Sequence, residues 1–161
     1  HEFTAYNLGV RANTSGHVLE RWRAEGELRR LPGQEVRLVF AFGTADMVLE
    51  DGQRRVSIKD SVANARVILE GSMSWGPGLM IGPPAVQDVN FLQRNQALSG
   101  AYGEMCQDMG VPFLPILPEL AEAELYMSDL RSMDGVHPGA AGYNQIFHLV
   151  DDWDVWRSWF A

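Results

Sequence analysis

The sequence predicts an α/β protein in which helices cover both faces of a central parallel sheet. Segments with the pattern of strands alternate along the chain with segments of helical spacing, and this order is typical of parallel strands joined by right-handed crossovers. The run from Val36 to Phe42 is short, continuous and apolar, as expected of a strand buried on both faces. The length of 161 residues suits one domain, residues 1–161.

The first half of the chain is predicted to contain two strands and two helices. The apolar, β-prone segment from Phe3 to Leu8 indicates a strand that ends at Gly9. Apolar residues recur at helical spacing over residues 15–30 and again over residues 57–69, so both segments predict helices. Residues 36–42, between these helices, predict the second strand.

The second half continues the alternation. Residues 79–81 predict a strand that a Gly-Pro-Pro turn ends, and residues 90–109 predict a helix. Residues 111–117 resemble a strand whose two prolines place it at a sheet edge. A loop over residues 134–142 precedes a terminal helix over residues 143–161. The expected architecture is a three-layer α/β/α sandwich of the flavodoxin-like type, which binds ligands beyond the carboxyl ends of its strands.

Composition excludes several classes of protein. Hydrophobic residues make up 46% and charged residues 21%, as in ordinary globular proteins. The net charge of -8 argues against nucleic acid as the main partner, because phosphate binding needs a basic surface. No apolar run is long enough for a membrane span. The lone Cys106 cannot form an internal disulfide, so we expect a cytoplasmic protein, or a secreted one if a signal peptide was removed.

The strongest chemical signal is the segment DGVHPGAAGY, residues 134–143. An Asp three residues before a His can accept a hydrogen bond from one imidazole nitrogen. That contact selects the tautomer, stabilises the imidazolium and leaves the other nitrogen to act as a base. We therefore predict that His137 is a general base and that Asp134 orients it. The alternative is a loop Asp that serves as a cap, beside a surface His.

Two glycine-containing turns follow predicted strands. In NLGVR, residues 7–11, Gly9 lets the backbone approach a ligand and present its N–H, as an oxyanion hole requires; a plain turn between strand and helix is the alternative. FGTAD, residues 42–46, follows the most buried strand, and its alternative is a turn in which Asp46 caps the next segment. Arg11 is expected either to anchor a carboxylate or phosphate of the substrate or to pair with a neighbouring acid.

In this order NLGVR, FGTAD and DGVHPGAAGY resemble the second, third and fifth blocks of the GDSL or SGNH family of serine hydrolases, and the strings are similar to those of small bacterial lipases and esterases. The resemblance implies the SGNH fold and an ester hydrolase that acts on a small ester substrate without a cofactor. By position it makes Gly9 the oxyanion glycine, His137 the base and Asp134 its orienting acid. The substrate site would be lined by Arg11, Thr44, Ala45 and Val136. No cluster of His, Cys or carboxylates has metal-ligand spacing, so no metal is expected.

The chain departs from the family pattern at two points. The family's first block, a Gly-Asp-Ser segment on the first strand, is absent, so the nucleophilic serine, with the first strand and helix, is expected to precede His1. Ser15 is the nearest rival nucleophile, but it lies where a helix should begin. Ala45 replaces the asparagine whose amide donates to the oxyanion, and losing one such donor costs roughly 10²–10³ in rate.

Two functions follow from these features. The first is serine-type ester hydrolysis through an acyl-enzyme, with the serine upstream of the residues given. The second is a catalytically degenerate relative that binds acyl groups or glycans without turning them over, and Ala45 favours it. Near the end of the chain, Trp153, Trp156 and Trp159 are expected to dock the last helix on the sheet; a homodimer contact or an acyl-binding surface is the alternative.

Overall fold

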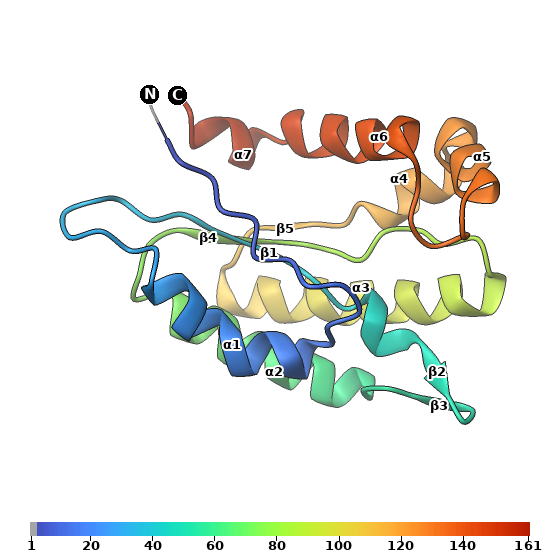
Figure 1. Cartoon of the computed structure of the whole chain (residues 1–161), viewed down its shortest axis with the longest axis horizontal. Coiled ribbons are helices and arrows are strands. Elements are labelled where there is room, and N and C mark those ends of the chain that lie inside the picture. The colour runs from blue at the N-terminus through green and yellow to red at the C-terminus, as the bar shows by residue number, and fades with distance from the viewer. Residues whose placement is uncertain (1–2) are drawn as a thin grey trace.

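A computed structural model describes residues 3–161 and confirms the three-layer α/β architecture (Figure 1). In chain order its elements are helix α1 (Ser15–Glu27), strand β1 (Leu38–Ala41), the 3-10 helix η1 (Thr44–Met47), strands β2 (Leu49–Glu50) and β3 (Gln53–Arg54), helix α2 (Ile58–Ser72), strand β4 (Gly78–Ile81), helix α3 (Val89–Met109), strand β5 (Phe113–Leu114), and helices α4 (Leu117–Glu122), α5 (Glu124–Ser132), α6 (Ala140–Asp151) and α7 (Asp154–Ser158).

The central sheet of the described residues is parallel and has the order β1-β4-β5. Residues 38–41 pair in register with residues 78–81, and Met80 pairs with Phe113. Helix α2 connects β1 to β4, and helix α3 connects β4 to β5. Strand β5 lies at the edge, as its prolines predicted, because proline has no N–H to give to a strand ladder.

Helices cover the two faces of the sheet (Figure 1). Helices α1, α2 and α3 lie on one face, and α4 to α7 lie on the other. Side chains alternate along β4: Met80 packs in the core shared with α1 to α3, whereas Leu79 and Ile81 pack in the core shared with α4 to α7. We call these the first and second core clusters. Strand β4 is therefore buried on both faces, as a central parallel strand must be.

Local chemistry sets the ends of the longer helices. The side chains of Thr14, Ser57 and Asp88 accept backbone N–H groups at the starts of α1, α2 and α3. Gly110 adopts a left-handed conformation (φ 66°) and ends α3. Cys106 lies buried within α3 as a small core residue, and burial raises the pKa of its thiol to about 11.

The strand predicted for residues 3–8 does not form, and that prediction is wrong. Residues 3–10 follow an irregular path over the surface, with Phe3 and Tyr6 exposed. Within residues 3–161, β1 pairs with β4 alone, so residues 3–8 do not pair with the open edge of β1. Its start lies beside α7, where the rings of Phe3 and Phe160 are 5.4 Å apart (Figure 1).

The predicted terminal helix is divided into α6 and α7. Trp153, between them, has an extended backbone (φ -76°, ψ 120°). Its side chain and those of Trp156 and Trp159 pack against the second core cluster, which includes Leu79 of β4. The tryptophans therefore dock the end of the chain on the sheet, as predicted. None of the helices in residues 3–161 combines the length and the apolar character needed to cross a membrane.

Candidate active site

The loop between α5 and α6 brings Asp134 and His137 together. Asp134 Oδ2 lies 2.8 Å from His137 Nδ1, while Oδ1 accepts the backbone N–H groups of Val136 and His137 at 2.9 and 2.7 Å. Both carboxylate oxygens therefore hold the loop and the ring in one geometry. The His137 side chain is 53% exposed, and its Nε2 has no hydrogen-bond partner among the described residues, so this nitrogen is available to take a proton.

These contacts also define the charge of the pair. The backbone N–H of His137 has the largest part in holding the pKa of the Asp134 carboxyl well below its usual range, and the imidazole and the N–H of Val136 act in the same direction. An ionised carboxylate has only acceptors, so His137 Nδ1 must carry the proton in the contact. Nε2 of the neutral ring is then the basic nitrogen, which is the arrangement that a general base needs.

Residues outside the motif anchor this loop. Gly135 has a φ of 78°, its N–H donates to the carbonyl of Leu130 at 3.1 Å, and its own carbonyl accepts the N–H of Gln87 at 2.8 Å. A Cβ on Gly135 would lie 2.8 Å from Gln87 Oε1 and 3.2 Å from Gln87 Cβ, and the positive φ also favours glycine at this position. Further along, the Asp129 carboxylate accepts the N–H of Gly142 at 2.7 Å. No motif in the sequence pointed to Gln87 or Asp129.

The third block lies at the carboxyl end of β1, where Gly43 adopts a φ of 117° and η1 follows. Thr44 and Ala45 are half-buried in η1. Val136 is also half-buried, and it packs against the first core cluster. In Figure 1, η1 and the loop between α5 and α6 lie at the same end of the molecule, as expected for the carboxyl ends of parallel strands. Within residues 3–161, no three His, Cys, Asp or Glu side chains are grouped so that they could hold a metal ion.

Asp46 joins the third block to three helices. Its Oδ1 accepts the N–H of Ser15 at 2.7 Å, its Oδ2 accepts the hydroxyl of Ser61, and that hydroxyl lies 2.6 Å from the hydroxyl of Tyr102. Asp46 is fully buried and caps α1 rather than the segment that follows it. Ser15 is fully buried too, and its hydroxyl accepts from Asn64 Nδ2 at 3.0 Å. Ser15 is therefore out of reach of a substrate and is not the nucleophile.

The second block is held by contacts of its own. The N–H of Gly9 donates to Asn7 Oδ1 at 2.8 Å, and the carbonyl of Leu8 accepts from Arg21 of α1 at 2.9 Å. In this geometry the Gly9 N–H is occupied within its own turn, so it would have to exchange partners to donate to an oxyanion. Arg11 is exposed and forms no ion pair within the part of the chain that the structure describes.

Several solved structures have this fold. The chain is similar to a catalytic mutant of Axe2, an acetylxylan esterase from Geobacillus stearothermophilus (TM-score 0.68, 14% identity, 86% of this chain and 66% of that chain). It is also similar to a lipase/acylhydrolase from Enterococcus faecalis (0.70, 19%, 86% and 69%) and to a GDSL-like lipase from Bacteroides thetaiotaomicron (0.65, 17%, 87% and 70%). At these identities the similarity shows the fold. The chain spans just under two thirds of the length of Axe2.

The family assignment rests on a match between the sequence and a family model. A comparison with curated proteins gives no match. The family model for the GDSL-like Lipase/Acylhydrolase family matches residues 2–145, a span that contains all three glycine-containing segments and the Asp134–His137 pair. The chain therefore belongs to the GDSL-like lipase/acylhydrolase family.

Proposed function

We propose that the protein is a serine-type ester hydrolase in which His137 is the general base and Asp134 orients it. The observation that carries the proposal is the 2.8 Å contact between Asp134 Oδ2 and His137 Nδ1, beside an exposed imidazole. Membership of the GDSL-like family, and neighbours described as an acetylxylan esterase and a lipase/acylhydrolase, support hydrolysis of a small ester. The nucleophilic serine would come from a segment outside the 161 residues, because these contain no Gly-Asp-Ser block and the nearest rival, Ser15, is buried.

The pair supplies the proton transfers of an acyl-enzyme reaction. The serine oxygen would attack the ester carbonyl carbon while His137 Nε2 takes the hydroxyl proton. When the tetrahedral intermediate collapses, the bond to the alcohol breaks and the leaving oxygen receives the proton from Nε2. A water molecule then repeats the two steps on the acyl-serine and releases the acid. Asp134 stays ionised throughout and stabilises the imidazolium in each step.

Hydrolysis of p-nitrophenyl acetate and butyrate by the full-length protein tests this role. His137→Ala should lower kcat/KM by roughly 10²–10⁴-fold, since it removes the base. His148→Ala is the matched control, because His148 is exposed on α6 and lies against Phe147 instead of a carboxylate. The proposal fails if the full-length protein hydrolyses these esters and both variants keep its activity.

The second candidate function is a domain that binds acyl groups or glycans without hydrolysing them. Ala45 favours this function, because a methyl group cannot donate to an oxyanion. The Gly9 N–H favours it too, since this N–H is already bonded to Asn7. Such a protein would have the same Asp134–His137 geometry, but its rate of ester hydrolysis would be very low.

Ala45→Asn separates the two functions. If Ala45 occupies the oxyanion position, the restored amide should raise kcat by roughly 10²–10³-fold. The same assays measure the effect, with Ala63→Asn on the exposed side of α2 as the control. No gain in a weak but measurable activity would show that Ala45 does not line the oxyanion. If the full-length protein instead binds an acyl or glycan ligand and hydrolyses no ester, the binding function is correct.

A further inference from the structure

A two-residue turn shapes the surface beside the third block. Asp51 and Gly52 both have positive φ angles (52° and 77°), as in a type I′ turn, and they join β2 to β3 in a hairpin. Consecutive residues of an extended segment point to opposite sides. Arg55 pairs with Glu50 at 3.1 Å, whereas the neighbouring Arg54 has no carboxylate partner within residues 3–161.

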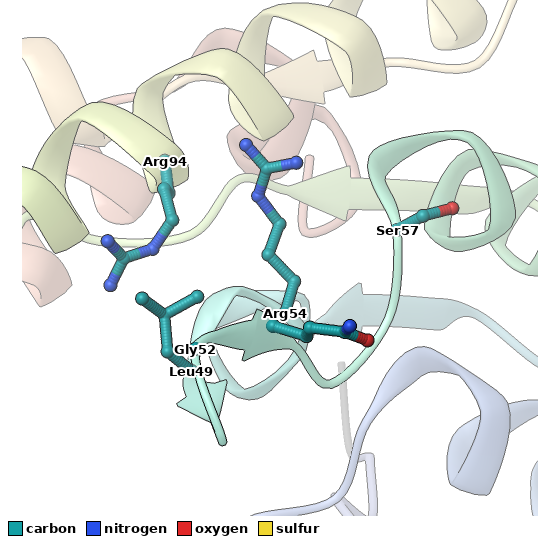
Figure 2. A pocket seen from close by; sticks show the side chains of 6 residues that line it. Leu49, Gly52, Arg54, Ser57 and Arg94 are labelled. Carbon is teal, nitrogen blue, oxygen red and sulfur yellow. The ribbon is translucent and has the colours of Figure 1, made fainter.

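Arg54 borders an open hollow of about 420 Å³ between the hairpin and α3. The hollow is lined by Leu49, Gly52, Gln53, Arg54, Ser57 and Arg94. Figure 2 shows the Arg94 side chain extending from α3 toward the hairpin and the Arg54 side chain extending from the hairpin toward α3, with Leu49 beside them. Two guanidinium groups from separate elements thus border the same space.

Arg94 is held in position before any ligand arrives. Its Nε donates to the carbonyl of Met47 at 2.9 Å, and its guanidinium lies 5.2 Å from the centre of the Phe91 ring. These contacts use one N–H and one face of the group, so the terminal amino groups of the half-buried side chain remain available. A guanidinium fixed in this way loses little conformational freedom when it binds an anion.

The charge of the hollow differs from that of the whole molecule. The chain carries a net charge of -8, yet neither Arg54 nor Arg94 forms an ion pair with a carboxylate among the described residues. Ser57, which lines the hollow, donates its hydroxyl to the Asp60 carboxylate at 2.7 Å. Two guanidinium groups that form no ion pair therefore border one concave surface.

We propose that this hollow binds the anionic oxygen group of a small ligand, a carboxylate or a phosphate. Guanidinium groups bind both through paired, charge-assisted hydrogen bonds. Met47, which Arg94 holds, ends η1, so the site borders the third block. The anion is either free or carried by the ester substrate. Binding itself is independent of the proposed hydrolysis, and only the substrate assignment rests on that function.

Titration with inorganic phosphate and with acetate at constant ionic strength, followed by NMR, tests the site. The 161-residue chain should bind these anions, and Arg54→Gln should weaken binding by about fivefold because an exposed charge is lost. Arg94→Gln should weaken binding further, by roughly tenfold, since that group is fixed. The Arg54 side chain makes no hydrogen bond in the described structure and only its backbone belongs to the β2–β3 ladder, so its variant stays informative if Arg94→Gln impairs folding.

Arg29→Gln is the matched control, because it removes the same charge at a place outside the hollow. The Arg29 guanidinium donates to the carbonyl of Glu25 near the carboxyl end of α1. The proposal is overturned if no anion binds, or if Arg29→Gln weakens binding as much as Arg54→Gln does. Equal weakening would show that net charge alone attracts the anions.

A second arm identifies the source of the anion. The full-length protein is assayed with mono-p-nitrophenyl succinate, which carries a carboxylate, and with p-nitrophenyl butyrate, which has a neutral acyl group of the same length. If the ester carries the anion, Arg54→Gln lowers kcat/KM about fivefold more for the succinate ester. Arg54→Gln could instead change kcat/KM equally for the two esters. If the unmodified chain also binds anions in the first arm, this result supports the site and assigns it to a free anion. If the unmodified protein does not hydrolyse the butyrate ester, this counts against the proposed function and leaves the binding result of the first arm unaffected.

Discussion

The carboxylate of Asp134 acts through both of its oxygens. Oδ2 contacts the imidazole, while Oδ1 accepts two backbone N–H groups of the same turn. A side chain that only held the ring would leave Oδ1 to water. Because Oδ1 binds the backbone of the turn, Asp134 fixes the orientation of the His137 ring relative to the turn, although the His137 side chain is 53% exposed.

This turn predicts an unusual titration of Asp134. Because folding lowers the pKa of this carboxyl, its contribution to stability is present above the ordinary carboxyl range and is lost only as the pH falls through the depressed value. The ¹³C shift of the Asp134 carboxyl should therefore stay constant from pH 7 to about pH 3, where ordinary carboxyls near pKa ~4 titrate. His137→Ala removes the imidazole contact and should raise the midpoint. A midpoint at the ordinary value in the unmodified protein would show that the turn does not form.

Distance along the chain decided which site residues could be predicted. Asp134 and His137 are three positions apart, so their spacing alone implied the contact that the structure shows. Asp46 and Tyr102 are far apart in the sequence, and a buried carboxylate shared by α1, α2 and α3 leaves no local pattern. Gln87 is equally hidden, because it contacts the loop through its backbone N–H, which every residue except proline has.

At the scale of the element, the loop between α5 and α6 depends on a glycine and α3 does not. Ala at Gly135 would meet Gln87 and strain a φ of 78°, so Gly135→Ala should destabilise the fold by about 1–3 kcal/mol. Gly100 lies within α3 with no atom near its missing Cβ, so Gly100→Ala should stabilise by roughly 0.5–1 kcal/mol. Urea unfolding measures both. Equal effects would mean that the loop conformation is wrong.

Helices with strong apolar spacing were predicted well, whereas helices α4 and α5 and the elements that depend on a partner were not. The predicted helix over residues 90–109 agrees with α3, because its apolar spacing lies within the segment and its caps, Asp88 and Gly110, directly flank the helix. Residues 3–8 have the composition of a strand and form none, since composition does not decide whether a segment pairs with a sheet edge. The β2–β3 hairpin has a local signal and also needs pairing. It was not predicted, although Asp51-Gly52 is a recognised turn signal.

At the scale of the whole molecule, the sheet has an open side. Within residues 3–161, β1 pairs with β4 and has no strand on its other side. Val39 of β1 is 43% exposed beside this unpaired backbone. Unpaired strand edges with apolar side chains pair readily with other chains.

Val39→Lys should therefore reduce self-association of the 161-residue chain with little loss of stability, because a lysine on an edge strand opposes edge-to-edge pairing. Light scattering across a range of concentrations measures the association. Val67→Lys is the control, since Val67 is 53% exposed on α2, away from the sheet. If both lysines reduce scattering equally, surface charge and not the strand edge is the cause.

The parallel register also has a consequence for the order of folding. Leu38 pairs with Gly78 and Met80 pairs with Phe113, so a whole helix must be spanned before either strand pairing can form. The entropy of closing such long segments is lost before the pairing returns any energy, whereas α1, α2 and α3 form from neighbours in the chain. We expect helical signal to appear first during refolding and the docking of β1, β4 and β5 to be the slow step. The surface that carries η1 would then be among the last parts of the protein to become ordered.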